Sequence, residues 1–461
     1  MAGIGFVLRK LYRKDNLSGL LGACMHSVFA STGPWIFTVL ALAIIGLISN
    51  HLVENSILMD FRSILIYNFS FSLVLSGPIF MICTRYLADS IHRRDVSTAI
   101  GMLFGGLSLL LLVSFCVASA FYFLYANLTP FVAVCAVINF VLVSSVWFFS
   151  IFVSALKNYK IITNAFFIGM LVAVLAITQL AGIYGVAGML NGFSIGLCVI
   201  IGILAANIFA EYPYKPVKPL AFIPYFTKYP KVALSGLIYN MAIWSDKWIM
   251  WFAPEATKLE IGLRVYSDYD SAMFMAYLTT VPVMAIFLFN TETHFFERYL
   301  KFYRNIEQKV SLSEIQKSHR DIILSIFRNA GYLLVTQIVI TSICILMAPK
   351  IIGLLNWNYM QVGILRYGLA GALFQVLTLF IIIIMSYFDN WKATLQIQLL
   401  FLVTNTALTA ASLYSGFEYY GYGYFLSSFI TFIVSVVIAS VYVSKLPYHT
   451  FITRNSSIYI N

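Results

Sequence analysis

The chain has 461 residues, of which 61% are hydrophobic and only 10% are charged, and its net charge is +11. Soluble domains carry about a quarter charged residues, whereas here apolar runs of bilayer-spanning length recur from one end to the other. The composition therefore excludes a soluble globular protein and indicates an all-α integral membrane protein.

The first 16 residues form a basic segment ahead of the first apolar run. Ile4, Leu8 and Leu11 fall on one side of a helix, and Arg9 and Lys10 fall elsewhere. This pattern is typical of an amphipathic helix that lies on an anionic lipid surface. Docking to a cytoplasmic partner is the alternative use of the same face.

The apolar runs between polar breaks predict twelve transmembrane helices. Very short connections join the third helix to the fourth and the fifth to the sixth, so each of these pairs is expected to be a tight antiparallel hairpin. The approximate limits are 17–49, 61–86, 97–125, 129–155, 161–182, 185–210, 230–253, 266–290, 322–348, 362–387, 393–414 and 420–444.

The distribution of Lys and Arg orients these helices. With the amino terminus inside, 23 of the 29 basic residues lie in inner segments and 5 in outer segments, while Lys247 lies within a helix. Cytoplasmic loops carry such an excess, so both termini are predicted to be cytoplasmic. The positive charge is thereby explained by topology and does not indicate a nucleic-acid partner.

Two Gly-Pro pairs interrupt the first two predicted helices near their middles. These are Gly33-Pro34 in "STGPWIF" and Gly77-Pro78 in "LSGPIF". Proline removes a hydrogen bond and kinks a helix, and transporters place hinges and cavities at such breaks. The two pairs are therefore candidate hinges, although an ordinary packing kink explains the same residues.

A proline-rich polar stretch, residues 211–229, is predicted to be a cytoplasmic linker. It divides the chain into an N-terminal six-helix bundle, 17–210, and a C-terminal six-helix bundle, 230–461. Each bundle begins and ends inside, as in transporters built from two halves related by an axis normal to the membrane.

A second polar segment, residues 291–321, is expected to form a cytoplasmic helical hairpin. "FFERYLKFYRNIE" has helical apolar spacing, and "SLSE", Ser311 to Glu314, fits a capping box for a helix that runs into the ninth span. Glu292, Glu297 and Arg298, together with Arg9 and Lys10 of the amino-terminal segment, are the candidate contacts for a cytoplasmic partner.

The seventh predicted helix carries two adjacent charges, Asp246 and Lys247, in "YNMAIWSDKWIMWFAP". A charge in hydrocarbon costs roughly 2.5–3.5 kcal/mol and normally faces protein or water. The pair is expected about 22 Å beyond Lys231, in the outer third of the membrane. There Lys247 has the alternative of extending to the outer surface within a belt of tryptophans.

Helical geometry predicts that these charges do not form a simple intrahelical pair, because adjacent residues point about 100° apart. Lys247 shares a stripe with Asn240, Trp244 and Trp251. Such a polar, aromatic wall suits a sugar-bearing substrate, and it equally suits a tight helix interface. The candidate substrate-pathway residues are Asp246, Lys247, Tyr239, Asn240, Trp244, Trp248 and Trp251, with Asp268 and Asp270 at the outer mouth, where they are placed to meet Lys247.

The sequence contains no Walker loop, no HExxH and no GxSxG motif, and its six cysteines show no CxxC spacing. No catalytic residue, metal site or cofactor is predicted. The protein is expected to act without an enzymatic reaction of its own.

The layout of twelve helices in two halves resembles the multidrug/oligosaccharidyl-lipid/polysaccharide flippase superfamily. Within it, "MAGIGFVLRKLYRKD", "STGPW", "FSLVLSGPIFMICTRYLAD", "YNMAIWSDKWIMWF" and "FNTETHFFERYLKFYRNIE" resemble the transporter family of the bacterial Pel exopolysaccharide system. The resemblance implies export of a hexosamine-rich polymer across the inner membrane for a biofilm matrix. It also implies a cytoplasmic glycosyltransferase and small membrane proteins as partners.

Two other functions stay open from the sequence. One is a lipid-linked oligosaccharide flippase or ion-coupled antiporter of the same superfamily, although the acid that multidrug relatives place in the first helix is absent here. The other is a scaffold that holds a membrane synthase complex and conducts nothing itself.

Overall fold

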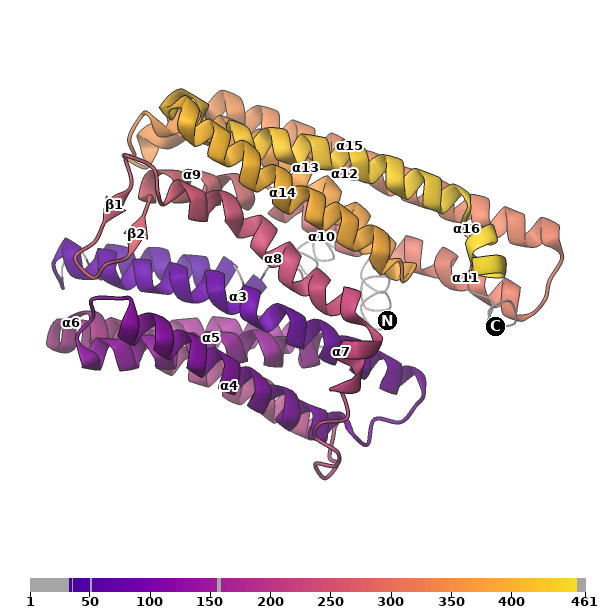
Figure 1. The fold of residues 1–461 in the computed structure, drawn as a ribbon, viewed down its shortest axis with the longest axis horizontal. Coiled ribbons are helices and arrows are strands. Elements are labelled where there is room, and N and C mark those ends of the chain that lie inside the picture. The colour runs from indigo at the N-terminus through magenta and orange to yellow at the C-terminus, as the bar shows by residue number, and fades with distance from the viewer. Residues whose placement is uncertain (1–32, 35, 50–51, 156–158, 454–461) are drawn as a thin grey trace, which may run out of the picture. The chain divides into compact units, whose positions relative to one another are not determined.

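A computed structural model describes residues 33–34, 36–49, 52–155 and 159–453 (Figure 1). Almost all of them are helical, and within these ranges nine helices are long and apolar enough to cross a membrane. The chain is therefore a multi-pass helical membrane protein. It packs as two compact units, Thr32–Ser267 and Asp268 onward, which are described in turn.

The first unit contains the helix Ile36–Ser49, five longer helices and a small hairpin of strands. α3, α4, α5 and α6 pack against one another, and α8 packs against α3. The elements are α3 (Asn55–His92), α4 (Ala99–Leu124), α5 (Pro130–Ala155), α6 (Tyr159–Glu211), the short α7 (Pro224–Lys228), α8 (Pro230–Met250), β1 (Thr257–Lys258) and β2 (Arg264–Val265). The strands pair antiparallel, and the sequence reading did not predict them.

α6 is a folded-back hairpin rather than one straight rod. Gly185 interrupts it with φ 55° and ψ −130°, a conformation open to glycine alone. On either side of it, Gly192 packs on the backbone of Ile177 and Gly196 packs on Ala173, which is an antiparallel register. The predicted hairpin of the fifth and sixth helices is confirmed, with small residues at its crossing.

The linker 211–229 lies along α4 and is tied to α3. The backbone carbonyls of Val217 and Pro219 sit where Cβ atoms on Gly101 and Gly105 would stand, so those two glycines let the linker approach the helix. The Arg93 Nη2 donates to the Tyr225 hydroxyl at 2.7 Å. A segment predicted to be a simple connection is thus a fixed part of the first unit.

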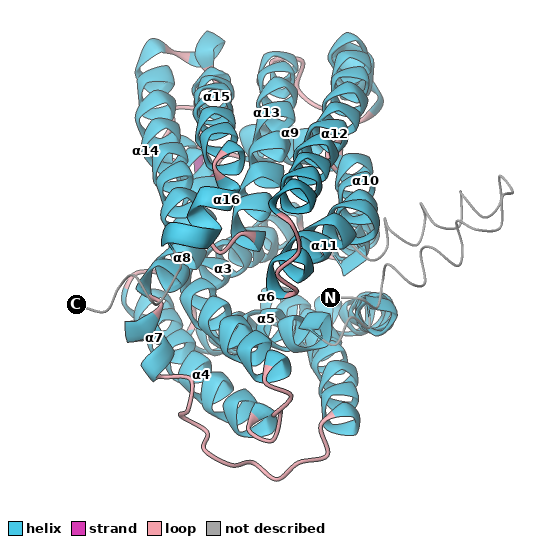
Figure 2. Cartoon of the chain, turned by 90° about the vertical axis from the view of Figure 1, so that its right-hand side faces the viewer, coloured by secondary structure: helices cyan, strands magenta, loops and turns pink. Residues whose placement is uncertain are grey.

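The second unit is a bundle of long helices (Figure 2). α13 packs between α12 and α15, and α14 packs on α15. Its elements are α9 (Ser267–Leu278), α10 (Val281–Asn290), the π-helix η1 (Thr291–Phe295), α11 (Phe296–Glu307), α12 (Leu312–Leu354), α13 (Gln361–Tyr387), α14 (Trp391–Ser415), the 3₁₀-helix η2 (Phe417–Tyr419), α15 (Tyr422–Ser444), α16 (Leu446–Tyr448) and the π-helix η3 (His449–Thr453).

The predicted hairpin of residues 291–321 is present as α11 and the start of α12. α12 begins after Ser311, as expected, and continues into the long span. The predicted capping box is wrong in detail, because the Ser311 hydroxyl pairs with that of Ser313 at 3.0 Å and makes no cap hydrogen bond to the helix. Phe302, fully buried, closes the hairpin against the ring of His319.

The predicted helix 266–290 is present as one apolar span, Ser267–Leu288, but it is divided into two helices, which the sequence did not predict. α9 ends at Leu278 and α10 begins at Val281, next to Pro282, which cannot donate a backbone hydrogen bond. The hydroxyls of Thr279 and Thr280 donate to the carbonyls of Ala276 and Tyr277 at 2.7 and 2.8 Å. The backbone N–H groups of the same two threonines donate to the same two carbonyls, so a tight turn replaces the helical pattern at this point.

Candidate transport site

α8 carries the charged stretch and follows directly from the linker. Pro230 occupies its first turn, where a missing N–H costs nothing. Serine, asparagine and the two charges lower its apolar character, and α8 is not among the nine strongly apolar helices of the described residues. It is nonetheless well packed, with Asp246 0% and Lys247 6% exposed.

Asp246 and Lys247 form an ion pair within α8. The Lys247 Nζ lies 3.1 and 3.0 Å from the two carboxylate oxygens of Asp246, and it also donates to the carbonyl of Ile243 at 3.2 Å. The expectation that adjacent residues would not pair is wrong, because the four-carbon stem of lysine bends the ammonium back across the helix surface. The alternative of Lys247 extending to the outer surface is also wrong, because its side chain is only 8% exposed.

Aromatic rings of α3 stack on the tryptophans of α8. The ring of Trp248 lies parallel to that of Phe71 at 5.0 Å, and Trp251 stacks on Tyr67 at 4.4 Å. Offset stacks of this kind contribute about 0.5–1.5 kcal/mol beyond buried area. Of the two uses foreseen for these tryptophans, the geometry is that of a tight helix interface.

Trp244 is placed differently from the other two tryptophans. The Lys247 ammonium lies 5.9 Å from the centre of its ring, at the edge of cation–π range. The ion pair is therefore bordered by an aromatic face on α8 itself.

α8 crosses α3 closely in its N-terminal half, before the two charged residues. A Cβ atom on Gly77 would stand 2.5 Å from the carbonyl oxygen of Gly236, and the reverse holds for Gly236 and the Gly77 carbonyl. Asn240 Nδ2 donates to the carbonyls of Leu73 and Gly236 at 3.0 and 2.9 Å. Both bonds of Asn240 go to backbone carbonyls, one on α3 and one on α8, so its side chain joins the two helices at this crossing.

The candidate hinges are described only in part. α3 continues through Pro78 as a single helix. Gly33 is buried against Thr163, and the carbonyl of Pro34 accepts from the Thr38 hydroxyl at 2.9 Å. A hinge role for Gly33, Pro34, Gly77 and Pro78 stays a prediction.

Sequence reasoning missed two α3 residues of this site, Tyr67 and Phe71. The Tyr67 hydroxyl donates to the carbonyl of Arg264 at 2.9 Å and accepts from its N–H at 3.3 Å, which ties the strand hairpin to α3. The only available signal was the aromatic spacing in "YNFSF", which fits any buried helix.

The remaining candidates lie outside this cluster. Asp268 and Asp270 are on α9 in the second unit, where Gln361 Nε2 donates to Asp268 Oδ1 at 2.7 Å. Their expected meeting with Lys247 stays a prediction. Glu297 and Arg298 are on α11, Glu292 is in η1 with its side chain outside the described part, and Arg9 and Lys10 also lie outside the described residues.

Comparison with known proteins identifies both a family and a fold. A family model described as PelG, putative exopolysaccharide exporter (EPS-E), matches residues 1–451. No curated protein matches the chain. The fold is similar to those of several solved transporters, at sequence identities that establish the fold alone.

Three of these structures illustrate the likeness. An outward-facing multidrug resistance MATE family transporter of the MOP superfamily has a TM-score of 0.68 at 12% identity, covering 92% of this chain and 96% of that one. A MOP superfamily transporter from Pyrococcus furiosus has a TM-score of 0.64 at 12% identity, covering 92% and 96%. A Vibrio cholerae MATE transporter variant has a TM-score of 0.62 at 12% identity, covering 95% and 97%.

Proposed function

The chain belongs to the PelG family of putative exopolysaccharide exporters, and from this premise we propose that it exports a hexosamine-rich, Pel-type exopolysaccharide across the bacterial inner membrane for a biofilm matrix. It is a multi-pass transporter and not an enzyme. The substrate and the membrane are the parts of the proposal that need testing.

Twelve crossings are part of the proposal. Nine helices are apolar and long enough, and α6 supplies two crossings because it folds back at Gly185. α8 and the helix Ile36–Ser49 complete the number. The distribution of basic residues supports cytoplasmic termini, and the linker 211–229 separates two sets of six crossings in this proposal.

The observation that supports a transport role for α8 is its buried ion pair. Removing two charges from water costs several kcal/mol per ion before their attraction compensates, and intramembrane ionisable residues mark substrate or ion pathways. The Asp246–Lys247 pair carries no net charge. A helix that carries a neutral ion pair suits the passage of a neutral glycan. A lone carboxylate would instead attract a cationic drug.

The proposal extends to the partners and the energy source. A cytoplasmic glycosyltransferase and small membrane proteins dock on the inner face, with Arg9, Lys10, Glu292, Glu297 and Arg298 as candidate contacts. Polymer synthesis by the glycosyltransferase, or an ion gradient, drives the glycan outward.

Secretion assays in cells that lack the chromosomal copy test this proposal. The double variant Asp246→Asn/Lys247→Met should reach wild-type levels in the membrane, pull down the same partners, and reduce secreted polymer at least tenfold. Asp246→Asn should show the same loss of secretion after correction for its level in the membrane. Glu260→Gln and Lys350→Met, which change exposed charges, are the matched controls and should secrete normally.

Other outcomes identify the other functions. Normal secretion from the double variant would remove the ion pair from the transport pathway. Drug efflux or lipid-linked oligosaccharide flipping by the purified protein would favour the antiporter or flippase. If the protein is required for polymer synthesis but all variants of the substrate-pathway residues secrete normally, the protein acts as a scaffold.

A further inference from the structure

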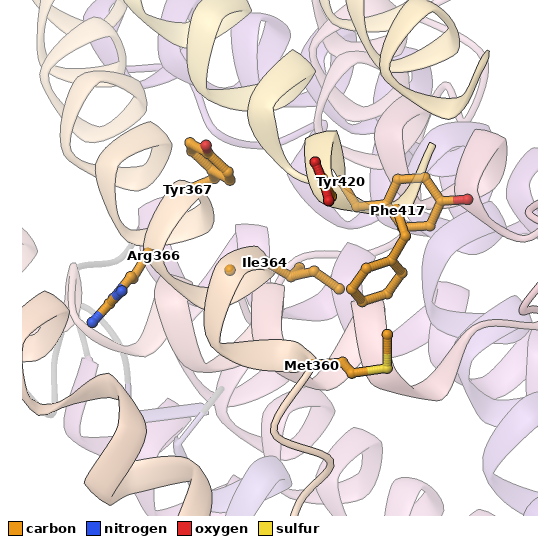
Figure 3. A pocket seen from close by; sticks show the side chains of 8 residues that line it. Met360, Ile364, Arg366, Tyr367, Phe417 and Tyr420 are labelled. Atoms are coloured by element: carbon orange, nitrogen blue, oxygen red, sulfur yellow. The ribbon is translucent and has the colours of Figure 1, made fainter. Parts of the chain in front are cut away.

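A pocket opens in the second unit where α13 begins and where η2 joins α14 to α15 (Figure 3). Its volume is about 430 Å³, within the roughly 300–1,000 Å³ of small-molecule sites. Tyr367 and Ile364 line it from α13, and Phe417, Glu418 and Tyr420 line it from the η2 segment. All of these residues belong to one compact unit.

The aromatic walls of the pocket are held in place. Tyr420 is 2% exposed, and its ring lies 5.2 Å from that of Phe417. The Ile364 side chain points toward the Phe417 ring across the pocket (Figure 3). On the α13 side, Tyr367 meets Tyr422 edge-on at 5.4 Å. The rings therefore form a preorganised apolar surface with hydroxyl groups at its margin.

Glu418 supplies a charged acceptor. Its carboxylate is exposed and forms neither a hydrogen bond nor an ion pair with any described residue. Arg366 also lines the pocket, but its Nε donates to the carbonyl of Ile345 at 3.4 Å, and it is not within ion-pair distance of Glu418. A carboxylate with two open oxygens accepts several hydrogen bonds from hydroxyl or amine groups.

Aromatic residues at a membrane surface commonly form a belt in the lipid headgroup region. Tyr414, near the same end of α14, has that character, because it is 93% exposed. The pocket residues differ from it, since they enclose a concavity and Tyr420 is buried within it. Their arrangement is that of a binding site with an apolar face and a few polar groups.

We propose that this pocket is a subsite for pyranose units of the exported glycan, where the rings cover the apolar face of a hexosamine and Glu418 accepts hydrogen bonds from its hydroxyl or amine groups. The assignment rests on the proposed function. In the predicted topology the pocket lies at the outer end of the bundle, so it would receive the chain as it leaves the membrane and would disfavour its return.

Binding to the purified full chain in lipid nanodiscs tests the subsite. The probes are the β-linked tetrasaccharide of N-acetylglucosamine and its deacetylated form, measured by calorimetry with saturation-transfer NMR. Phe417→Ala should weaken both at least fivefold, and Glu418→Gln should weaken the deacetylated form more. Tyr414→Ala and Glu260→Gln are matched controls for an exposed ring and an exposed acid and should bind as wild type.

Several results would overturn the assignment. Unchanged binding in Phe417→Ala and Glu418→Gln would leave these rings as belt residues. Equal binding of spermidine would make the pocket a general cation site. If Phe417→Ala and Glu418→Gln weaken tetrasaccharide binding but cells that carry the wild-type protein secrete no glycan, the subsite stands and the proposed export function fails. If secretion depends on Asp246 but neither binding nor secretion responds to Phe417→Ala, export stands and the subsite fails.

Discussion

Replacing Lys247 with methionine should destabilise the first unit strongly. The change shortens the side chain by one atom and removes an ammonium that lies 3.0 and 3.1 Å from the oxygens of a carboxylate with 0% exposure. Breaking a buried pair by removing one partner costs about 3–5 kcal/mol, because the other charge stays buried. Asp246→Asn should also destabilise, by less, because the carbonyl of Ile243 still accepts from the ammonium.

The double variant Asp246→Asn/Lys247→Met should fold nearly as well as wild type. Both charges are gone, and replacing a buried pair by neutral groups of similar volume is often neutral or stabilising. The coupling energy of the cycle is then close to the sum of the two single-variant costs, so it should be at least about 3–5 kcal/mol, which is above the usual 0.5–3 kcal/mol for contacting residues. Equilibrium unfolding in mixed micelles of dodecyl maltoside and SDS, followed by tryptophan fluorescence, measures each free energy of unfolding.

A second ion pair provides the control cycle. Arg85 and Asp89 lie one turn apart on α3, 3.4 Å from each other, with side chains 25% and 26% exposed. Partly exposed pairs of this spacing contribute about 0.3–0.5 kcal/mol. If Lys247→Met costs no more than Arg85→Met, and the two coupling energies agree, water reaches Asp246 and Lys247, and the argument from burial is refuted.

Three further substitutions test other parts of the first unit. Gly77→Ala should destabilise by about 1–3 kcal/mol, because the new methyl would stand 2.5 Å from the carbonyl oxygen of Gly236; the same unfolding assay reads it out. Gly185→Ala forces a side chain into a backbone conformation with φ 55° and should cost about 1–3 kcal/mol, lowering the apparent melting temperature in nanodiscs. Tyr67→Phe loses its bonds to Arg264 and should cost about 1 kcal/mol, with faster proteolysis of the strand hairpin.

A glycine on the open side of α6 separates these effects from the general cost of changing glycine. Apart from its chain neighbours and the nearby backbone of its own helix, no atom of the described residues lies within 4 Å of a Cβ built on Gly202. Gly202→Ala should therefore be neutral or slightly stabilising through helix propensity. Equal destabilisation by Gly77→Ala and Gly202→Ala would contradict the close crossing of α3 and α8.

Regular features of the sequence predicted much of the fold. Apolar runs predicted most of the long helices. The hairpin within α6 was predictable because the connection between its two halves is so short that they must pack antiparallel. The start of α12 was also correctly placed after Ser311, since a serine ahead of an apolar periodic run is a strong start signal. The family could be recognised from motifs at the amino terminus, in the first two predicted helices, in the charged stretch and after the eighth predicted helix.

Other features depend on contacts between distant segments. The partners of Trp248 and Trp251 are rings about 180 residues earlier in the chain, which no local pattern selects. The break between α9 and α10 needed Pro282 to be weighed together with Thr279 and Thr280. The pairing of Lys247 with its neighbour was missed because residue spacing describes Cβ directions, whereas a long side chain chooses its partner by reach.

The sequence adjacency of Asp246 and Lys247 also bears on how α8 enters the membrane during synthesis. A lysine and an aspartate that must find each other on separate helices would be exposed to lipid singly until both helices had arrived. Here the two charges can neutralise each other as soon as one turn of α8 has formed, before any neighbour is in place. The newly made segment then presents an electrically neutral surface to the insertion machinery, and α3, already in the bilayer, needs to supply only rings and a glycine.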